Sequence, residues 1–151
     1  MVEVRFGSSA CGLRASWVKR VVTSTLKFEK ISGRTISVFM TNDRQIRKIN
    51  KLYLDHDYAT DVISFWFKTS RLVKKEADHL GDLVVSVETA KSVAKEMGIP
   101  FKEELARYLV HGTLHLLGYN DKKVRDKKRM YRRQEWIVDQ LCTSAERLSK
   151  A

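Results

Sequence analysis

The feature that most constrains the fold of this chain is an apolar segment, residues 101–117, that carries two histidines and is followed by a glycine. Leucine and valine side chains fall on several sides of the segment, which predicts a helix in the centre of the molecule rather than at its periphery. His111 and His115 lie four residues apart, so both imidazoles leave one face of that helix a single turn apart. Gly118 supplies the left-handed residue that ends such a helix. We therefore expect the fold to be built around this helix.

The same segment predicts a metal site. Two histidines at this spacing can bind one ion, and beyond the turn the carboxylate of Asp121 could return to it as a third ligand. Two nitrogens and one oxygen leave one position for water. Two alternatives stay open here. The histidines could be hydrogen-bonded core residues, and Asp121 could be the N-cap of the next helix, with Asn120 as another candidate cap.

Length and composition bound the class of protein. With 151 residues, of which 43% are hydrophobic and 31% charged, the sequence predicts a single globular domain over residues 1–151. No apolar run reaches the length of a membrane span, and the first residues do not resemble a secretory signal. We expect a cytoplasmic protein that has no membrane partner.

A basic excess indicates a polyanionic partner. Lys and Arg number 29 against 18 acidic residues, which gives a formal net charge of +11. Nucleic acid is favoured over membrane, because no basic amphipathic anchor stands apart from the fold. Five of these cations directly follow the metal motif: Lys122, Lys123, Arg125, Lys127 and Lys128. They are predicted to contact a phosphate backbone from the start of a long C-terminal helix, the alternative being a solvated charged face.

Hydrophobic periodicity predicts alternating strands and helices, and hence an α+β fold. Strands are expected at residues 2–6, 35–40, 61–67 and 83–87, and helices at 13–30, 43–53, 90–97, 101–117 and 122–148. The strand at 61–67 is almost wholly apolar, which predicts burial on both faces. Residues 68–80 are expected to form an exposed loop that contains His79. His56 is interpreted as a solvated loop histidine rather than part of a second metal site.

Three blocks of this sequence together resemble the YbeY family of metal-dependent endoribonucleases. They are Asn50 to Phe65, then Leu80 to Glu88, then His111 to Tyr119, and in this order they span most of residues 42–140. The resemblance implies a small mixed four-stranded sheet covered by helices, similar to the zincin core, with the metal site on a central helix. It also implies one zinc ion per chain, ribosomal RNA as substrate, and a role in ribosomal RNA processing and ribosome quality control.

Two positions depart from the family pattern. The family motif ends Gly-Tyr-Asp-His, with the final histidine as third ligand, whereas residues 118–121 here read Gly-Tyr-Asn-Asp. An arginine that the family uses in RNA cleavage is Leu54 in this chain. The resemblance implies that His111 and His115 are zinc ligands in the catalytic site, and it supports Asp121 by position only. It also suggests that Ser86 and Glu88 support the metal site or the substrate, the alternative being ordinary strand-end residues.

The expected function is that of a zinc-dependent single-strand endoribonuclease. Because Leu54 replaces the cleavage arginine, the alternative is a non-catalytic RNA-binding ribosome-assembly factor whose metal is mainly structural. A metalloprotease is disfavoured, because the residue after the first histidine is Gly112 and not the glutamate that serves as general base.

Overall fold

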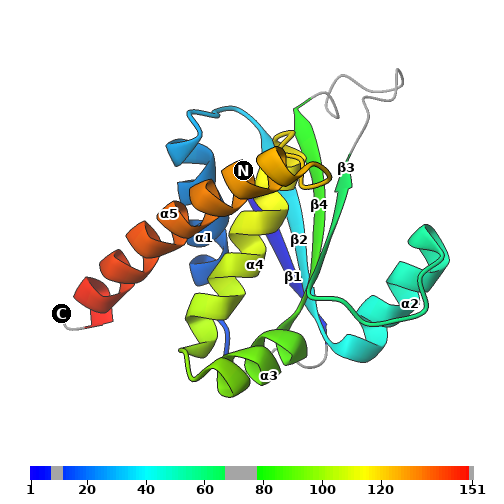
Figure 1. Ribbon diagram of the computed structural model, residues 1–151. Coiled ribbons are helices and arrows are strands. Elements are labelled where there is room, and N and C mark those ends of the chain that lie inside the picture. The colour runs from blue at the N-terminus through cyan, green and yellow to red at the C-terminus, as the bar shows by residue number, and fades with distance from the viewer. Residues whose placement is uncertain (8–11, 67–77, 150–151) are drawn as a thin grey trace.

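The centre of the molecule is a mixed sheet of four strands in the order β1-β2-β4-β3. A computed structural model describes residues 1–7, 12–66 and 78–149 (Figure 1). The strands are β1 (Val2–Phe6), β2 (Thr35–Thr41), β3 (Val62–Trp66) and β4 (His79–Ser86). Strands β1, β2 and β4 are parallel, and β3 pairs antiparallel with β4 at one edge. The predicted α+β class and small mixed sheet are confirmed.

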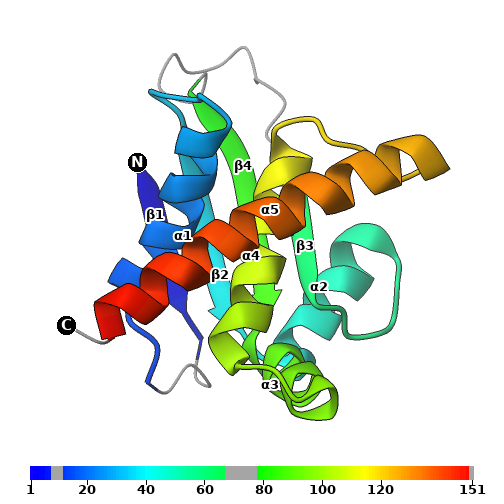
Figure 2. The ribbon, with the colours of Figure 1, turned by 60° about the vertical axis from the view of Figure 1, so that its left-hand side comes forward.

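Five helices in the described residues surround this sheet. They are α1 (Ala15–Phe28), α2 (Asp43–Leu54), α3 (Val87–Met97), α4 (Phe101–Leu116) and α5 (Val124–Ser149). Helix α4 contacts β3, β4, α1, α3 and α5, and α5 crosses its outer surface (Figure 2). The central position predicted for this helix is confirmed. Within the described ranges, none of the helices combines the length and the apolarity needed to cross a membrane.

Alternation along the strands gives the sheet an apolar layer on each face. The larger layer lies against α1 and α4, and in the sheet it includes Ile36, Val38, Met40, Leu83 and Val85. On the opposite face, Ile63 and Val84 pack against Ile46 of α2. Each of these side chains is at most 6% exposed. Burial of this apolar surface fixes α4 between the sheet and α5.

Local sequence signals set several helix ends where they were predicted. The side chain of Asn42 caps α2 by accepting a hydrogen bond from the backbone nitrogen of Gln45 at 2.8 Å. Helix α3 ends at Gly98, whose φ of +67° is the left-handed conformation that glycine adopts without strain. Gly118 follows the end of α4 with a φ of +98°. The turn at Gly118 brings the chain back toward the histidine face.

Several predicted boundaries or burial patterns were wrong, and one of them is the start of α3, which begins at Val87 and not at residue 90. Strand β3 lies at the sheet edge, and only Ile63 in it is buried, so it is not covered on both faces. Strand β4 begins at His79, inside the expected loop, because pairing with β2 extends the strand backward from the apolar run. The remainder of that loop, residues 68–77, lies outside the described residues. Helix α5 begins at Val124 and not directly after Asp121.

Gly112, between the two histidines, lets α4 approach the sheet closely. A Cβ atom there would lie 2.8 Å from Leu83 Cδ2 and 3.1 Å from Val62 Cγ2. We expect Gly112→Ala to lower the free energy of unfolding by about 1 kcal/mol, since overpacking costs about 1–3 kcal/mol and alanine returns about 1 kcal/mol of helix propensity. Urea denaturation measures the change. In a double-mutant cycle, Leu83→Val should reduce the loss of stability caused by Gly112→Ala, because it removes the atom nearest to the new Cβ. Unchanged stability of Gly112→Ala alone would contradict the steric explanation.

Candidate metal centre

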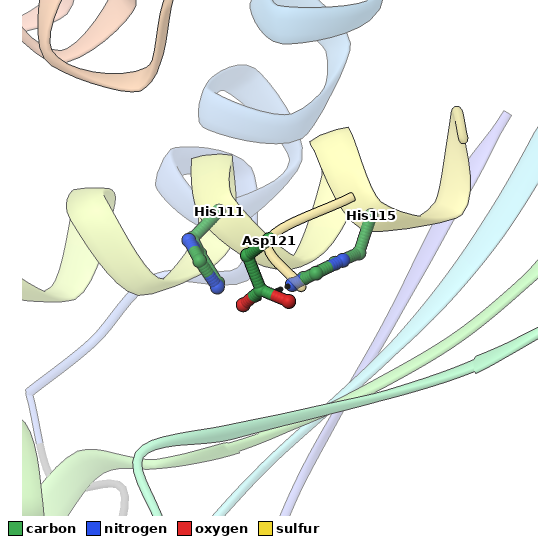
Figure 3. Close-up of side chains that lie close together, drawn as sticks. All are labelled: His111, His115 and Asp121. Atoms are coloured by element: carbon green, nitrogen blue, oxygen red, sulfur yellow. Dashed lines mark ion pairs between the residues drawn. The ribbon is translucent and has the colours of Figure 1, made fainter. Parts of the chain in front are cut away.

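His111, His115 and Asp121 converge beside the sheet, as Figure 3 shows. One donor atom from each of the three residues lies within 4.8 Å of the other two. The Oδ2 atom of Asp121 is 3.4 Å from Nε2 of His115, and the two imidazole rings are 4.7 Å apart and nearly perpendicular. The four-residue spacing therefore places both rings on one face of α4, as predicted. The turn after Gly118 brings Asp121 to them.

The second nitrogen of each ring is held by a hydrogen-bond acceptor. Nδ1 of His111 is 2.7 Å from Oε1 of Gln134 on α5, and Nδ1 of His115 is 3.1 Å from the backbone oxygen of Tyr119. An acceptor at Nδ1 keeps the proton there and leaves a lone pair on Nε2. Metal-binding histidines are oriented in this way in proteins. The donor set and its supporting bonds therefore fit a divalent metal ion.

The electrostatic environment favours the neutral form of His115. Burial is the main cause of a lowered pKa for this ring, and the neighbouring charge of His111 adds to it. The carboxylate of Asp121 and the hydrogen bond to Tyr119 act in the opposite direction but do not reverse the shift. A histidine must be neutral to bind a metal ion, so this shift keeps the ring competent at neutral pH.

Tyr119 is itself fixed by contacts that join three parts of the chain. Its hydroxyl donates to Oε2 of Glu29, at the end of α1, over 2.9 Å. Arg133 of α5 donates from Nε to the other oxygen of Glu29 over 2.6 Å. Burial and the nearby Glu29 both raise the pKa of Tyr119. Because these bonds hold the turn after α4, they also hold the carbonyl group that orients His115.

A cleft of about 600 Å³ opens beside the three residues. The 54–61 segment and β3 form its other wall, and the lining includes Asn50, Leu54, His56, Tyr58, Thr60, Asp61, Ser64 and Trp66. Nε1 of Trp66 donates to the backbone oxygen of His115 over 2.8 Å, which joins β3 to the histidine helix. Tyr58 is 55% exposed and Trp66 58%, so both rings are accessible from the cleft. Leu54 contributes an apolar side chain to the lining.

The N-cap alternative for Asp121 is not what the structure shows. The backbone oxygen of Lys123 accepts the hydrogen bond from Lys127 N over 2.8 Å, so Asp121 lies two residues before the cap of α5. Asn120 stabilises the turn instead, by accepting from the backbone nitrogen of Lys122 over 2.7 Å. The carboxylate of Asp121 is left to face His115.

Ser86 and Glu88 have structural contacts at the junction of two helices. The hydroxyl of Ser86 caps α3 by accepting from the backbone nitrogen of Thr89, and it donates to a carboxylate oxygen of Asp43. Glu88 accepts a hydrogen bond from the backbone nitrogen of Asp43 over 3.1 Å. Neither residue lines the cleft. Their role in supporting the metal site or the substrate therefore stays a prediction. The contacts that the structure shows are the cap of α3 by Ser86 and the hydrogen bond from Asp43 to Glu88.

The five predicted RNA-contacting cations do not share one surface. Lys127 lines a cavity of about 260 Å³ that also contacts His111 and Asp121. Lys122 and Lys123 are exposed in the turn before α5. The other two, Arg125 and Lys128, line a separate groove. The sequence showed that basic residues are dense in this segment, but it did not show which of them lie on which side of α5.

The fold and the site together define a class of protein. Its members are small α+β proteins with a candidate metal-binding motif on a central helix. The sequence profile described as Endoribonuclease YbeY matches residues 12–142. The chain belongs to this family, and the resemblance seen in its three sequence blocks is confirmed.

Curated relatives named Endoribonuclease YbeY match most of this chain. The protein of Persephonella marina is 36% identical over 126 residues, which cover 83% of this chain and 82% of the relative. That of Bacillus cereus strain B4264 is 37% identical over 131 residues, with 82% and 84% covered. The relative from Myxococcus xanthus is 41% identical over 109 residues, covering 72% of this chain but 37% of the relative.

A solved structure shows the same fold. The solution structure of TM1509 from Thermotoga maritima superimposes with a TM-score of 0.66 at 21% sequence identity. The match covers 97% of this chain and 92% of that protein.

Proposed function

We propose that this protein is a zinc-dependent endoribonuclease that cleaves single-stranded RNA. The convergence of the His111, His115 and Asp121 donor atoms within 4.8 Å, on the wall of an open cleft, carries the proposal. Membership of the family supports RNA as the substrate class. We further propose that residues 1–151 act as one domain in the cytoplasm, on ribosomal RNA or ribosomal particles, in ribosomal RNA processing and ribosome quality control.

The three side chains would hold one zinc ion through Nε2 of each histidine and a carboxylate oxygen of Asp121. When bound, such an ion would lower the pKa of a coordinated water to about 7 and would stabilise negative charge on a phosphoryl oxygen. The carboxylate ligand shifts the preference of the site somewhat toward harder metals than a third histidine would.

The chain's own residues would bind and orient the substrate around this site. Gln134 and the Tyr119 carbonyl keep the two imidazoles in place through their Nδ1 atoms. Tyr58 and Trp66 offer exposed rings on the cleft wall, where unpaired bases can stack. Lys127, beside His111 and Asp121, is placed to contact a phosphate group. This arrangement favours an unpaired strand over a duplex, whose bases are already stacked.

A nuclease assay with metal exchange tests the proposal. Purified protein is incubated with single-stranded RNA and with a structured ribosomal RNA fragment, before and after a chelator and after zinc is restored. Cleavage that the chelator abolishes and zinc restores is the expected result. Cleavage that survives chelation would contradict a metal-dependent activity, and RNA binding without cleavage would favour the assembly-factor alternative.

Asp121→Ala is expected to weaken zinc binding by at least about tenfold, because even outer contacts of a metal site contribute this much. The melting temperature of the metal-free variant should stay near that of the parent, since Asp121 does not cap α5. Titration against a competing chromophoric chelator gives the affinity, and thermal denaturation gives the stability. Asp126→Ala, a similar loss of charge on α5, is the control. Unchanged affinity with a lowered melting temperature would assign Asp121 a capping role instead.

A further inference from the structure

A second groove lies on α5, on the side of the helix away from the metal cleft. Its volume is about 550 Å³, and its lining consists of Tyr119, Arg125, Lys128, Arg129, Arg132, Arg133 and Trp136. The side of α5 toward the metal site is formed by other residues, among them Lys127, Tyr131 and Gln134. Figure 2 shows α5 lying across the outside of the molecule. We call this site the α5 groove.

The α5 groove concentrates positive charge without internal compensation. Five of its seven lining residues are Lys or Arg, and none is acidic. Arg125, Lys128 and Arg132 are exposed, and within the described part of the chain no carboxylate lies at ion-pair distance from any of them. Arg133 differs, because its Nε atom is bound to Glu29. Like charges gathered on one helix repel each other, so a bound polyanion would stabilise this surface.

Trp136 of the α5 groove is held in place by aromatic and cationic contacts, and part of it stays exposed. Trp136 packs edge to face against Phe28 of α1, with the ring centroids 5.1 Å apart. The guanidinium of Arg133 lies 4.7 Å from the centre of the same indole, and that of Arg129 lies 5.6 Å from the centre of the Tyr119 ring. Trp136 nevertheless remains 44% exposed. The exposed part of this indole lies in the same groove as the exposed cations Arg125, Lys128 and Arg132, and it is suited to stack on a nucleobase.

We propose that the α5 groove binds single-stranded RNA at a site separate from the metal cleft. Arg125, Lys128 and Arg132 contact successive phosphates, and a base stacks on Trp136. An acidic peptide would use the cations but has no need of the exposed indole, so RNA accounts for more of the groove. The inference rests on the proposed function only in taking RNA as the substrate class. The groove would hold one part of the RNA while another part enters the metal cleft.

Fluorescence anisotropy with a labelled oligouridine tests the α5 groove. The charge variant is Arg125→Glu/Arg132→Glu, and the matched control is Lys91→Glu/Lys95→Glu on α3, which makes the same change in net charge elsewhere. Relative to the control, the charge variant should bind at least about tenfold more weakly. The slope of log Kd against log salt should fall by about 1.4, because each phosphate contact on a single strand contributes about 0.7. Binding equal to that of the control would overturn the proposal.

Two further measurements show whether the ligand is RNA or another polyanion, and whether a variant has lost binding or lost its fold. Trp136→Leu should weaken binding by about fivefold or more through lost stacking, with thermal denaturation showing that the variant is folded. Arg125 and Arg132 are exposed, so their variant should melt near the parent temperature. If polyglutamate competes as well as RNA and Trp136→Leu binds normally, the occupant is an acidic protein and the proposal fails.

Failure of this inference and failure of the proposed function give different results. The binding assay is run on chelated protein, so it does not depend on cleavage. If the protein cleaves RNA but the charge variant binds RNA like the control, the proposed function stands and the proposal for the α5 groove fails. If the protein does not cleave RNA but the charge variant loses RNA binding, the proposal for the α5 groove stands and the proposed nuclease function fails.

Discussion

Replacing His115 by alanine is expected to lower the rate of RNA cleavage by at least about a thousandfold. The change removes one of three metal donors, and the Lewis-acid contribution of a metal ion amounts to several kcal/mol of transition-state stabilisation. The fold should persist, because Trp66 of β3 donates to the backbone oxygen of His115 and not to its ring. The cleavage rate and the zinc content of the purified variant are the two measurements.

The matched control for His115→Ala is a histidine outside the cleft. His79 of β4 is 2.8 Å from the Thr35 hydroxyl and 2.9 Å from a carboxylate oxygen of Asp82. His79→Gln keeps polar atoms at these positions, and we expect it to retain both zinc and cleavage. If His115→Ala cleaved RNA at the parent rate in the same preparation, the activity would come from another nuclease or another site.

The parts of the fold that could be predicted from the sequence depend on local chemistry. Asn42 and Gly98 mark helix ends through their own hydrogen bonds or backbone angles, so neighbouring residues are enough to find them. The four-residue spacing of His111 and His115 likewise fixes their shared face once the segment is helical. A turn after Gly118 was also foreseeable, and with it the return of Asp121 toward the two histidines.

The parts that could not be predicted depend on partners far away in the chain. The apolar run of β3 gives no sign that it forms a sheet edge, because strand order is set by packing of the whole sheet. Glu29, at the end of α1, and Gln134, on α5, support the candidate metal centre, and neither belongs to a recognisable motif. The basic residues of α5 share a short segment, yet its helical period sends Lys127 to the metal side and Arg125 to the other.

Gly81→Ala is expected to lower the free energy of unfolding by about 3 kcal/mol or more. A Cβ atom at this position would lie 2.2 Å from the backbone oxygen of Phe65 and 2.7 Å from Leu116 Cδ2, and φ is +155°. The nearer atom belongs to the backbone of β3, so relief requires the strand to move. Overpacking and backbone strain contribute about 1–3 kcal/mol each. Because Gly81 pairs with Trp66, movement of β3 should also disturb the Trp66 contact to His115 and slow cleavage.

Gly33→Ala separates the steric effect at Gly81 from the cost of an unusual backbone angle. Gly33 has a φ of +69°, but a Cβ atom there would meet nothing within 4 Å. Its replacement should therefore cost about 1–2 kcal/mol, the price of a left-handed conformation alone. Urea denaturation of both variants gives the comparison, and the excess loss at Gly81 contains the close approach of β3 together with any further strain of its φ of +155°. Equal losses at the two glycines would mean that β3 can shift freely, and that its contact with the histidine helix does not hold the cleft wall in place.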